Sequence, residues 1–102
     1  MTKVIIEVDA LVKKELIGRM VLSQAGHDKG DCYVIIDELE NNLLLANGST
    51  KTTKKPKLKK FKHLLFTNVM DLDIQEAILS KDKNLNLKIK RFLKLNGNVK
   101  EG

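Results

Sequence analysis

Apolar residues fall in short segments over the first part of the chain, and small polar residues separate them. Residues 18–22 form one such segment, and residues 32–39 form a second that is rich in aromatic and β-branched side chains. Side chains of these types fit a pleated, half-buried surface. Two glycines and several small polar residues occupy 23–31, a composition typical of the loop between paired strands. The pattern predicts two strands joined by this loop, with a turn at 40–42 after the second strand.

The next apolar segment, residues 43–46, predicts a third strand. The Asn-Gly pair that follows it is a strong hairpin signal, so a returning strand is expected over 49–53. Residues 54–60 contain the only proline, which is unfavourable in a helix or a central strand, and they are interpreted as an extended loop. Residues 61–66 alternate in part and are expected to close the sheet. Short strands with tight turns favour a small barrel over a sandwich.

Helical spacing replaces this pattern in the last third of the chain. Asp73, with Glu76 three residues later, fits a capping box and predicts a helix over 74–80. A second helix is expected from residue 85 to about residue 95, ended by Asn96-Gly97, because apolar residues repeat there with helical spacing. The apolar stripe of this helix consists of Leu85, Ile89, Phe92 and Leu93.

The N-terminal segment has a weaker pattern. Residues 3–8 are expected to form an edge strand, and an aspartate before residues 10–16 is expected to begin a short helix. With 102 residues, the chain is long enough for one domain with a modest core. The expected organisation is an N-terminal arm over 1–15, a β domain over 16–67, a helical extension over 68–97 and a frayed tail over 98–102.

Charge is distributed very unevenly along the chain. The net charge is +6, and residues 51–62 contain seven lysines and no acidic residue. Residues 1–50 contain five Lys/Arg and eight Asp/Glu, whereas residues 63–102 contain seven and five. The positive excess therefore belongs to one segment of a dozen residues, which indicates an anionic partner such as nucleic acid.

Several classes of protein are disfavoured by the composition. No apolar run approaches the roughly 18 residues that span a bilayer, and acids at Glu7 and Asp9 do not fit a secretory signal. A single cysteine excludes an intramolecular disulfide, and Cys32, His27 and His63 are too few for a structural zinc site. A cytoplasmic protein without cofactor, metal or membrane partner is expected.

The loop between the first two strands carries a motif. The residues Gly18, Val21, Ser23, Ala25-Gly26, Asp28-Lys29-Gly30 and the apolar segment after them resemble the KOW motif. The resemblance is to small bacterial KOW proteins related to a large-subunit ribosomal protein of archaea and eukaryotes. It extends over about residues 16–67 through the third strand and the lysines. His27 is a departure, because relatives often carry an arginine there.

This resemblance implies both a fold and a function. The implied fold is mainly β, a small SH3-like (KOW) β-barrel with one or two C-terminal helices, and Gly30 is the implied KOW glycine. The implied function is RNA binding in association with the ribosome or its assembly, with ribosomal RNA and ribosomal proteins as partners.

The lysine segment is the first candidate for contact with RNA. Lysines contact phosphates as point charges and release counterions, which gives salt-dependent binding with little sequence preference. The alternative is a solvated loop that only increases solubility. The candidate residues are Lys51, Lys54, Lys55, Lys57, Lys59, Lys60 and Lys62.

The glycine loop is the second candidate. Successive backbone N–H groups in a glycine turn can form a concave anion site, to which Lys29 beside Gly30 adds charge. His27 is a candidate for stacking on a base or for carrying charge near neutral pH. The alternatives are that the glycines serve only the turn and that His27 is an exposed loop residue without a role.

Little in the sequence supports catalysis. Cys32 lies in an apolar strand and is expected to be a buried structural thiol. Only four aromatic residues are present, of which Phe66 and Phe92 are expected in the core, while Tyr33 is expected either half-buried or facing RNA. This scarcity favours recognition of folded RNA by backbone and shape.

The sequence therefore predicts a non-enzymatic protein that binds structured RNA, with no small-molecule substrate. The alternative is an SH3-like adaptor that binds proteins without contacting RNA, for which the apolar stripe over 85–93 is the candidate surface.

Overall fold

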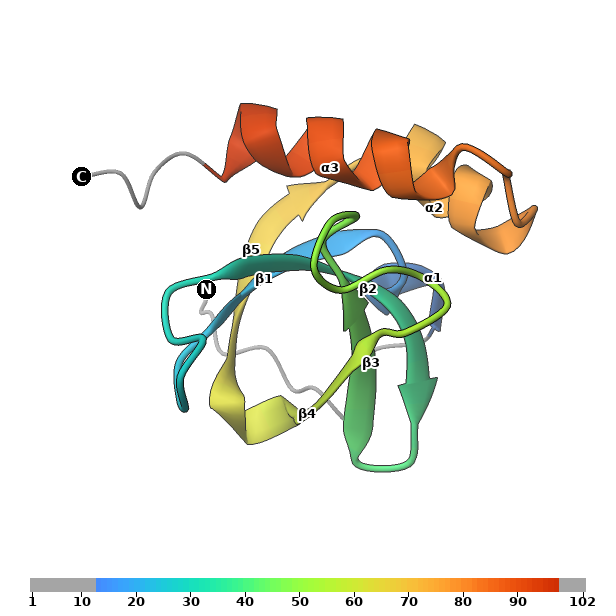
Figure 1. Cartoon of the computed structure of the whole chain (residues 1–102). Coiled ribbons are helices and arrows are strands. Elements are labelled where there is room, and N and C mark those ends of the chain that lie inside the picture. Colours follow the sequence, from blue (N-terminus) through green and yellow to red (C-terminus); the bar gives the residue numbers. More distant parts are fainter. Residues whose placement is uncertain (1–12, 98–102) are drawn as a thin grey trace.

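The computed structural model describes residues 13–97, and one antiparallel sheet of five strands forms the main part of them (Figure 1). The order of the strands across the sheet is β4-β3-β2-β1-β5. The prediction of a mainly β protein with C-terminal helices is confirmed. The strands are β1 (Arg19–Ser23), β2 (Cys32–Leu39), β3 (Asn42–Ala46), β4 (Lys57–Lys60) and β5 (Leu64–Met70).

The sheet is not closed into a barrel. Within residues 13–97, β4 pairs only with β3 and β5 pairs only with β1, so these two strands are its edges. The expected closure over 61–66 is therefore wrong. A 3₁₀ helix, η2 (Phe61–His63), follows the four-residue β4 and turns the chain, and β5 begins only at Leu64. A strand as short as β4 offers few backbone groups for further pairing.

The connection between β3 and β4 also differs from the expectation. No strand forms over 49–53; residues 47–56 form a loop, and the end of the expected loop, Lys57–Lys60, is β4 itself. Asn47 explains this difference, since its side-chain Oδ1 accepts from the backbone N–H groups of Ser49 at 3.0 Å and Lys51 at 2.8 Å. These bonds satisfy locally the backbone groups that a strand would pair with a neighbour.

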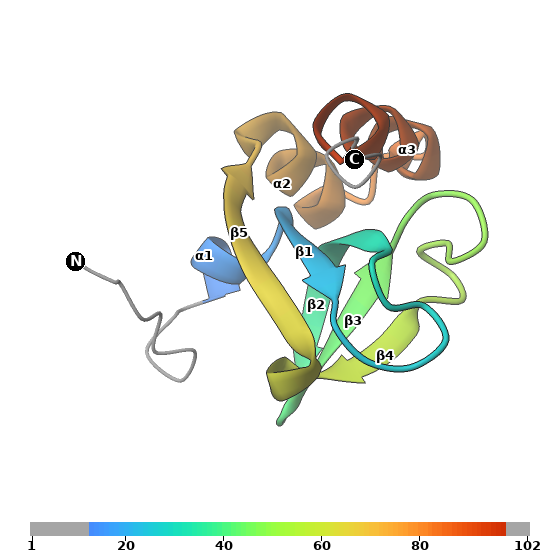
Figure 2. The same ribbon diagram turned by 90° about the vertical axis from the view of Figure 1, so that its left-hand side faces the viewer.

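Helices cover one face of the sheet (Figure 2). Helix α2 (Leu72–Leu79) and helix α3 (Leu85–Asn96) pack there over a core that includes Met20, Val34 and Ala46. The apolar stripe of α3 is buried in this core: Leu85, Ile89, Phe92 and Leu93 are at most 9% exposed. The predicted second helix is confirmed, and its stripe is not available to a partner protein.

The other face of the sheet has its own core. Val21 and Ile35 pack there with Leu43 and with Leu16 of α1 (Lys13–Leu16). Because alternate residues of β1 and β2 point to opposite faces, these strands are buried on both sides. This explains their nearly continuous apolar sequence. The expected strand over 3–8 and the beginning of the expected helix over 10–16 lie outside the described residues.

Helix α2 begins two residues earlier than the sequence indicated. Asp71 is its N-cap, and its carboxylate accepts from the backbone N–H groups of Asp73 at 2.7 Å and Ile74 at 3.3 Å. Asp73, the expected cap, lies in the first turn. Within residues 13–97 no helix is long and apolar enough to cross a membrane.

Candidate nucleic-acid interface

The residues that the sequence assigned to RNA contact lie on three parts of the chain. An ion pair joins the loop between β1 and β2 to β4, whereas the loop between β3 and β4 packs against α3. The residues are His27, Lys29 and Gly30 in the loop between β1 and β2; Lys51, Lys54 and Lys55 in the loop between β3 and β4; and Lys57, Lys59, Lys60 and Lys62 in β4 and η2.

Lys59 is held inside the protein by three acceptors. Its side chain is only 9% exposed, and its Nζ lies 2.6 Å from Oδ1 of Asp28. The same nitrogen donates to the Ser23 hydroxyl and to the carbonyl oxygen of Ala25, each at 2.9 Å. An ammonium group has three donors, and all three are used here. Lys59 therefore has no donor left for a phosphate and is a structural residue.

Asp28 is the centre of this network, which we call the Asp28 cluster: Ser23, Asp28, Tyr33 and Lys59. The Tyr33 hydroxyl donates to Oδ2 of Asp28 at 2.8 Å, and the Ser23 hydroxyl lies 2.9 Å from Oδ1. Burial by itself raises the pKa of Asp28, but the hydrogen bonds from Lys59, Tyr33 and Ser23 outweigh it and hold the pKa well below its ordinary value. Burial and the bond to Asp28 raise the pKa of Tyr33 well above its ordinary value.

The alternation of β4 decides which of its lysines face solvent. Successive side chains of a strand point to opposite faces, so Lys57 and Lys59 share the side that faces Asp28. Lys57 Nζ lies 3.8 Å from Oδ2 of Asp28, and its side chain is 32% exposed. Leu58 and Lys60 point the other way and are both exposed. Inward-facing charges on an edge strand also oppose pairing with a second chain.

The loop between β1 and β2 does not present its backbone as an anion site. Gly30 has φ +94°, which explains why glycine is present there. However, the N–H groups of Lys29, Gly30 and Asp31 donate to the carbonyl oxygens of Gly26, Ser23 and Asp28, respectively. The predicted concave anion site is therefore not formed by these groups. The side chains of His27 and Lys29 are exposed.

The loop between β3 and β4, residues 47–56, is fixed on α3. Gly48 has φ +82°, and a Cβ there would collide with the carbonyl oxygen of Asn86 and the backbone nitrogen of Lys90. The backbone N–H of Thr53 donates to Oδ1 of Asn86 at 3.0 Å. These contacts hold Lys54 and its neighbour Lys55 at the surface, where both are exposed, while Lys51 is half-buried.

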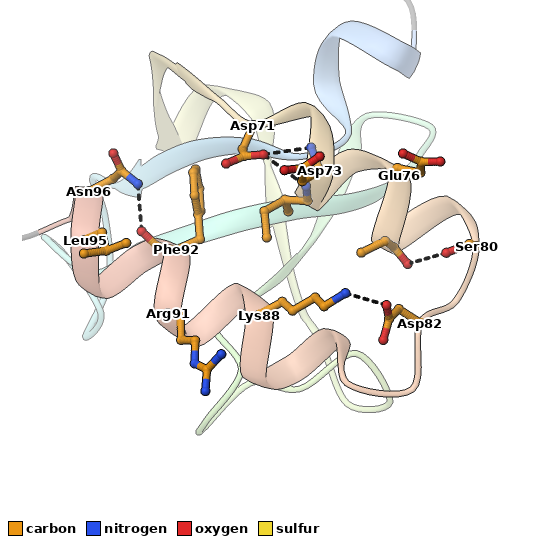
Figure 3. A pocket seen from close by; sticks show the side chains of 12 residues that line it. Asp71, Asp73, Glu76, Ser80, Asp82, Lys88, Arg91, Phe92, Leu95 and Asn96 are labelled. Atoms are coloured by element: carbon orange, nitrogen blue, oxygen red, sulfur yellow. Dashed lines mark hydrogen bonds and ion pairs between the residues drawn. The ribbon is translucent and has the colours of Figure 1, made fainter.

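Two clefts lie on either side of the turn between α2 and α3, and they differ in charge. The cleft between the two helices has a volume of about 630 Å³ (Figure 3). Four of its lining residues are acidic, Asp71, Asp73, Glu76 and Asp82, against two cations, Lys88 and Arg91. Lys88 Nζ lies 2.6 Å from Oδ2 of Asp82, and this hydrogen bond lowers the pKa of Asp82. An acidic cleft is unsuitable for a polyanion.

The second cleft has a volume of about 540 Å³ and lies between the 47–56 loop and the same turn. Three lysines line it, Lys54, Lys81 and Lys83, together with Asp37 and Asp82. Its apolar lining includes Ile36 and Leu44 from the sheet and Ile78 from α2. Sequence reasoning placed the lysine segment on the β domain alone and missed its association with Lys81 and Lys83.

The Asp28 cluster also contains a serine and a lysine 2.9 Å apart, a pairing that some hydrolases use. Ser23 is 1% exposed, so a substrate has no access to its hydroxyl. The Lys59 nitrogen is occupied by hydrogen bonds to Asp28, Ser23 and Ala25, so it is part of a structural network. Within residues 13–97 no three His, Cys, Asp or Glu side chains are placed to hold a metal ion.

No protein-family model matches the chain, and a search of curated proteins found no match either. The Asp28 cluster was not predicted from the sequence. Its signals were an aspartate in the loop, with Ser23 five residues before it and Tyr33 five residues after it on the paired strands.

Proposed function

We propose that this protein binds structured RNA through phosphate contacts made by the exposed lysines of residues 51–62. The observation that carries the proposal is the placement of Lys54, Lys55, Lys60 and Lys62. All four are exposed, and within residues 13–97 no acidic side chain forms an ion pair with them. Four unpaired cations in nine residues concentrate charge at a density that phosphates neutralise well.

The proposed fold relationship is a KOW domain of the SH3-like type. It is supported by the order β4-β3-β2-β1-β5, with the 3₁₀ helix η2 between β4 and β5, and by the left-handed Gly30 in the motif. A strongly curved but open sheet of this order is a departure from a closed barrel (Figures 1 and 2). Association with the ribosome or its assembly is part of the proposal and comes from the resemblance to the KOW family alone.

The burial of the aromatic residues supports the proposed mode of RNA recognition. Tyr33 is 2% exposed with its hydroxyl bound to Asp28, and Phe92 is 7% exposed in the helical core. Phe61 and Phe66 contact each other edge to face beside the other core. A single-strand platform needs several exposed rings, so shape and phosphate contacts are the proposed basis of binding.

Affinity for a folded RNA, measured over a range of salt concentration, tests the proposal. Replacing Lys54, Lys55 and Lys60 by Ala is expected to reduce the slope of log affinity against log salt by about 3, because each lysine contributes about one released counterion. The matched control replaces Lys90, Arg91 and Lys94, three exposed cations of α3, by Ala.

The control removes the same charge from a different surface and is expected to change the slope much less. Equal effects of the two triple variants would show that only net charge matters. Absence of any salt dependence in the unmodified protein would exclude the phosphate mechanism.

A further inference from the structure

The cleft between the 47–56 loop and the α2–α3 turn combines lysines with apolar surface, which complement the phosphate and the base of a nucleotide. Lys54 is on one wall and Lys81 and Lys83 are on the other, and all three are exposed. Ile36, Leu44 and Ile78, each half-buried, supply apolar surface between these walls. The volume of about 540 Å³ is in the range of small-ligand sites.

The acidic residues of the cleft are engaged with other groups. Asp82 is bound by Lys88 at 2.6 Å and also accepts from the backbone N–H of Asn84 at 2.7 Å. Asp37 accepts from the backbone N–H of Glu38 at 2.8 Å. With Asp82 paired to Lys88, the three lysines outnumber the remaining carboxylate, so the cleft favours an anion.

The amide of Asn86 supplies a polar group at the edge of the cleft. Its Oδ1 is used by Thr53 at 3.0 Å, and this bond fixes the orientation of the side chain. Within residues 13–97 no acceptor is bound by its Nδ2, which leaves two N–H donors for a ligand. An oriented amide beside an apolar surface is suited to the edge of a nucleobase.

We propose that this cleft receives one unpaired nucleotide of the bound RNA, such as a bulged or loop nucleotide. Its phosphate lies between the lysines of the two walls, its base lies over Leu44 and Ile78, and the Asn86 amide donates to the base edge. A continuous duplex cannot use the apolar surface, because its bases are stacked and paired, whereas an unpaired nucleotide exposes a base face. This inference rests on the proposed function and adds the kind of RNA that is preferred.

Two RNAs and two double variants test the proposal. The RNAs are a blunt-ended duplex and the same duplex interrupted by one unpaired nucleotide. The cleft variant is Lys81→Asn with Lys83→Gln; asparagine is chosen because Lys81 has φ +56°, a conformation that asparagine tolerates. The control variant is Arg91→Gln with Lys94→Gln, which removes the same charge from α3 outside this cleft.

The unmodified protein is expected to bind the interrupted duplex about fivefold more tightly than the continuous one, a preference of the size that burial of part of a base provides. The cleft variant is expected to lose this preference and to reduce the salt slope by about 2, whereas the control variant keeps the preference. Methyl resonances of Leu44 and Ile78 are expected to shift on addition of the interrupted duplex.

Failure of the two proposals can be distinguished. If the unmodified protein binds neither RNA, the proposed function is wrong. If it binds both RNAs equally and the Leu44 and Ile78 methyl resonances do not shift at saturation, RNA binding stands and the nucleotide cleft is wrong. A preference that survives in the cleft variant also overturns the cleft proposal.

Discussion

Lys59 Nζ of β4 lies 2.6 Å from Oδ1 of Asp28 in the loop between β1 and β2. The two residues are 31 positions apart, and their ion pair ties the loop between β1 and β2 to an edge strand of the sheet. A lysine from the most basic segment of the chain thus stabilises the fold. Its neighbour Lys60, one position along the same strand, is exposed.

Replacing Lys59 by Ala is expected to lower the free energy of unfolding by about 2–4 kcal/mol, because the change leaves Asp28 enclosed without its cation. Urea unfolding measures this effect. The control is Lys60→Ala, which removes the same charge from an exposed position and is expected to change stability by less than about 0.5 kcal/mol. Equal stabilities of the two variants would contradict a structural role for Lys59.

Stability is expected to fall in acid because of Asp28. Since the folded protein holds the pKa of Asp28 below its value of about 3.9 in the unfolded chain, the unfolded state takes up the proton first as pH falls. The contribution of the ionised Asp28 to the free energy of unfolding is complete above about pH 4 and decreases progressively below it. Urea unfolding over pH 2–6 measures it. Asp28→Asn is expected to be less stable at pH 6 and to show a flatter acid dependence than the unmodified protein.

Tyr33 is expected to limit stability at the alkaline end. Its folded-state pKa is raised, so the stabilisation from its neutral hydroxyl is complete below about pH 10, its unfolded pKa, and is lost above that pH. Comparison of Tyr33→Phe with the unmodified protein tests this, because the variant has no phenol to ionise. If both proteins lose stability in parallel above pH 10, groups other than Tyr33 cause the loss.

Two glycines with similar dihedral angles are expected to respond differently to substitution by Ala. At Gly30, with φ +94°, a Cβ would meet no atom within 4 Å, whereas at Gly48, with φ +82°, it would meet the backbone of Asn86 and Lys90. Gly30→Ala should cost about 1–2 kcal/mol from the left-handed backbone alone. Gly48→Ala should cost more and should speed amide exchange at Thr53 as the loop leaves α3. If Gly48→Ala lowered the free energy of unfolding less than Gly30→Ala, close packing of Gly48 against α3 would be contradicted.

The cap of α2 provides a matched pair of aspartates. Asp71→Ala is expected to lower the free energy of unfolding by about 1 kcal/mol, because two backbone N–H groups lose their acceptor. Asp73→Ala is expected to cost only a few tenths of a kcal/mol, from its interaction with the helix dipole. Thermal unfolding of the two variants measures the difference. A larger loss of stability in Asp73→Ala than in Asp71→Ala would show that Asp73 is the cap.

Local sequence patterns identified most elements of the fold. The strands around 18–22, 32–39 and 43–46 and the helix that begins at residue 85 were found because their signals are local: β-branched and apolar residues for strands, and helical spacing for α3. The strand over 49–53 was wrongly predicted because the Asn-Gly signal does not show whether Asn47 will bind its own backbone.

The sequence located the positive charge but not the role of each lysine. Lys57 and Lys59 were grouped with their neighbours because composition treats all lysines alike. Lys57 and Lys59 face Asp28, whereas Lys60 points to the opposite side of β4. This depends on which residues of β4 face inward and on the position of Asp28 beside this edge strand. The association of Lys54 with Lys81 and Lys83 likewise depends on α3 packing against the 47–56 loop.

By itself, the sequence determined a mainly β chain with an amphipathic C-terminal helix and a concentration of lysine in residues 51–62, because apolar periodicity and composition are properties of neighbouring residues. Tertiary structure alone decided that the sheet stays open, that Lys59 is neutralised by Asp28, and that Lys54 shares a cleft with the α2–α3 turn. Those outcomes depend on contacts between residues far apart in the chain, such as Asp28 with Lys59 at a separation of 31 and Thr53 with Asn86 at 33. Pattern along the chain carries no information about which distant side chains meet.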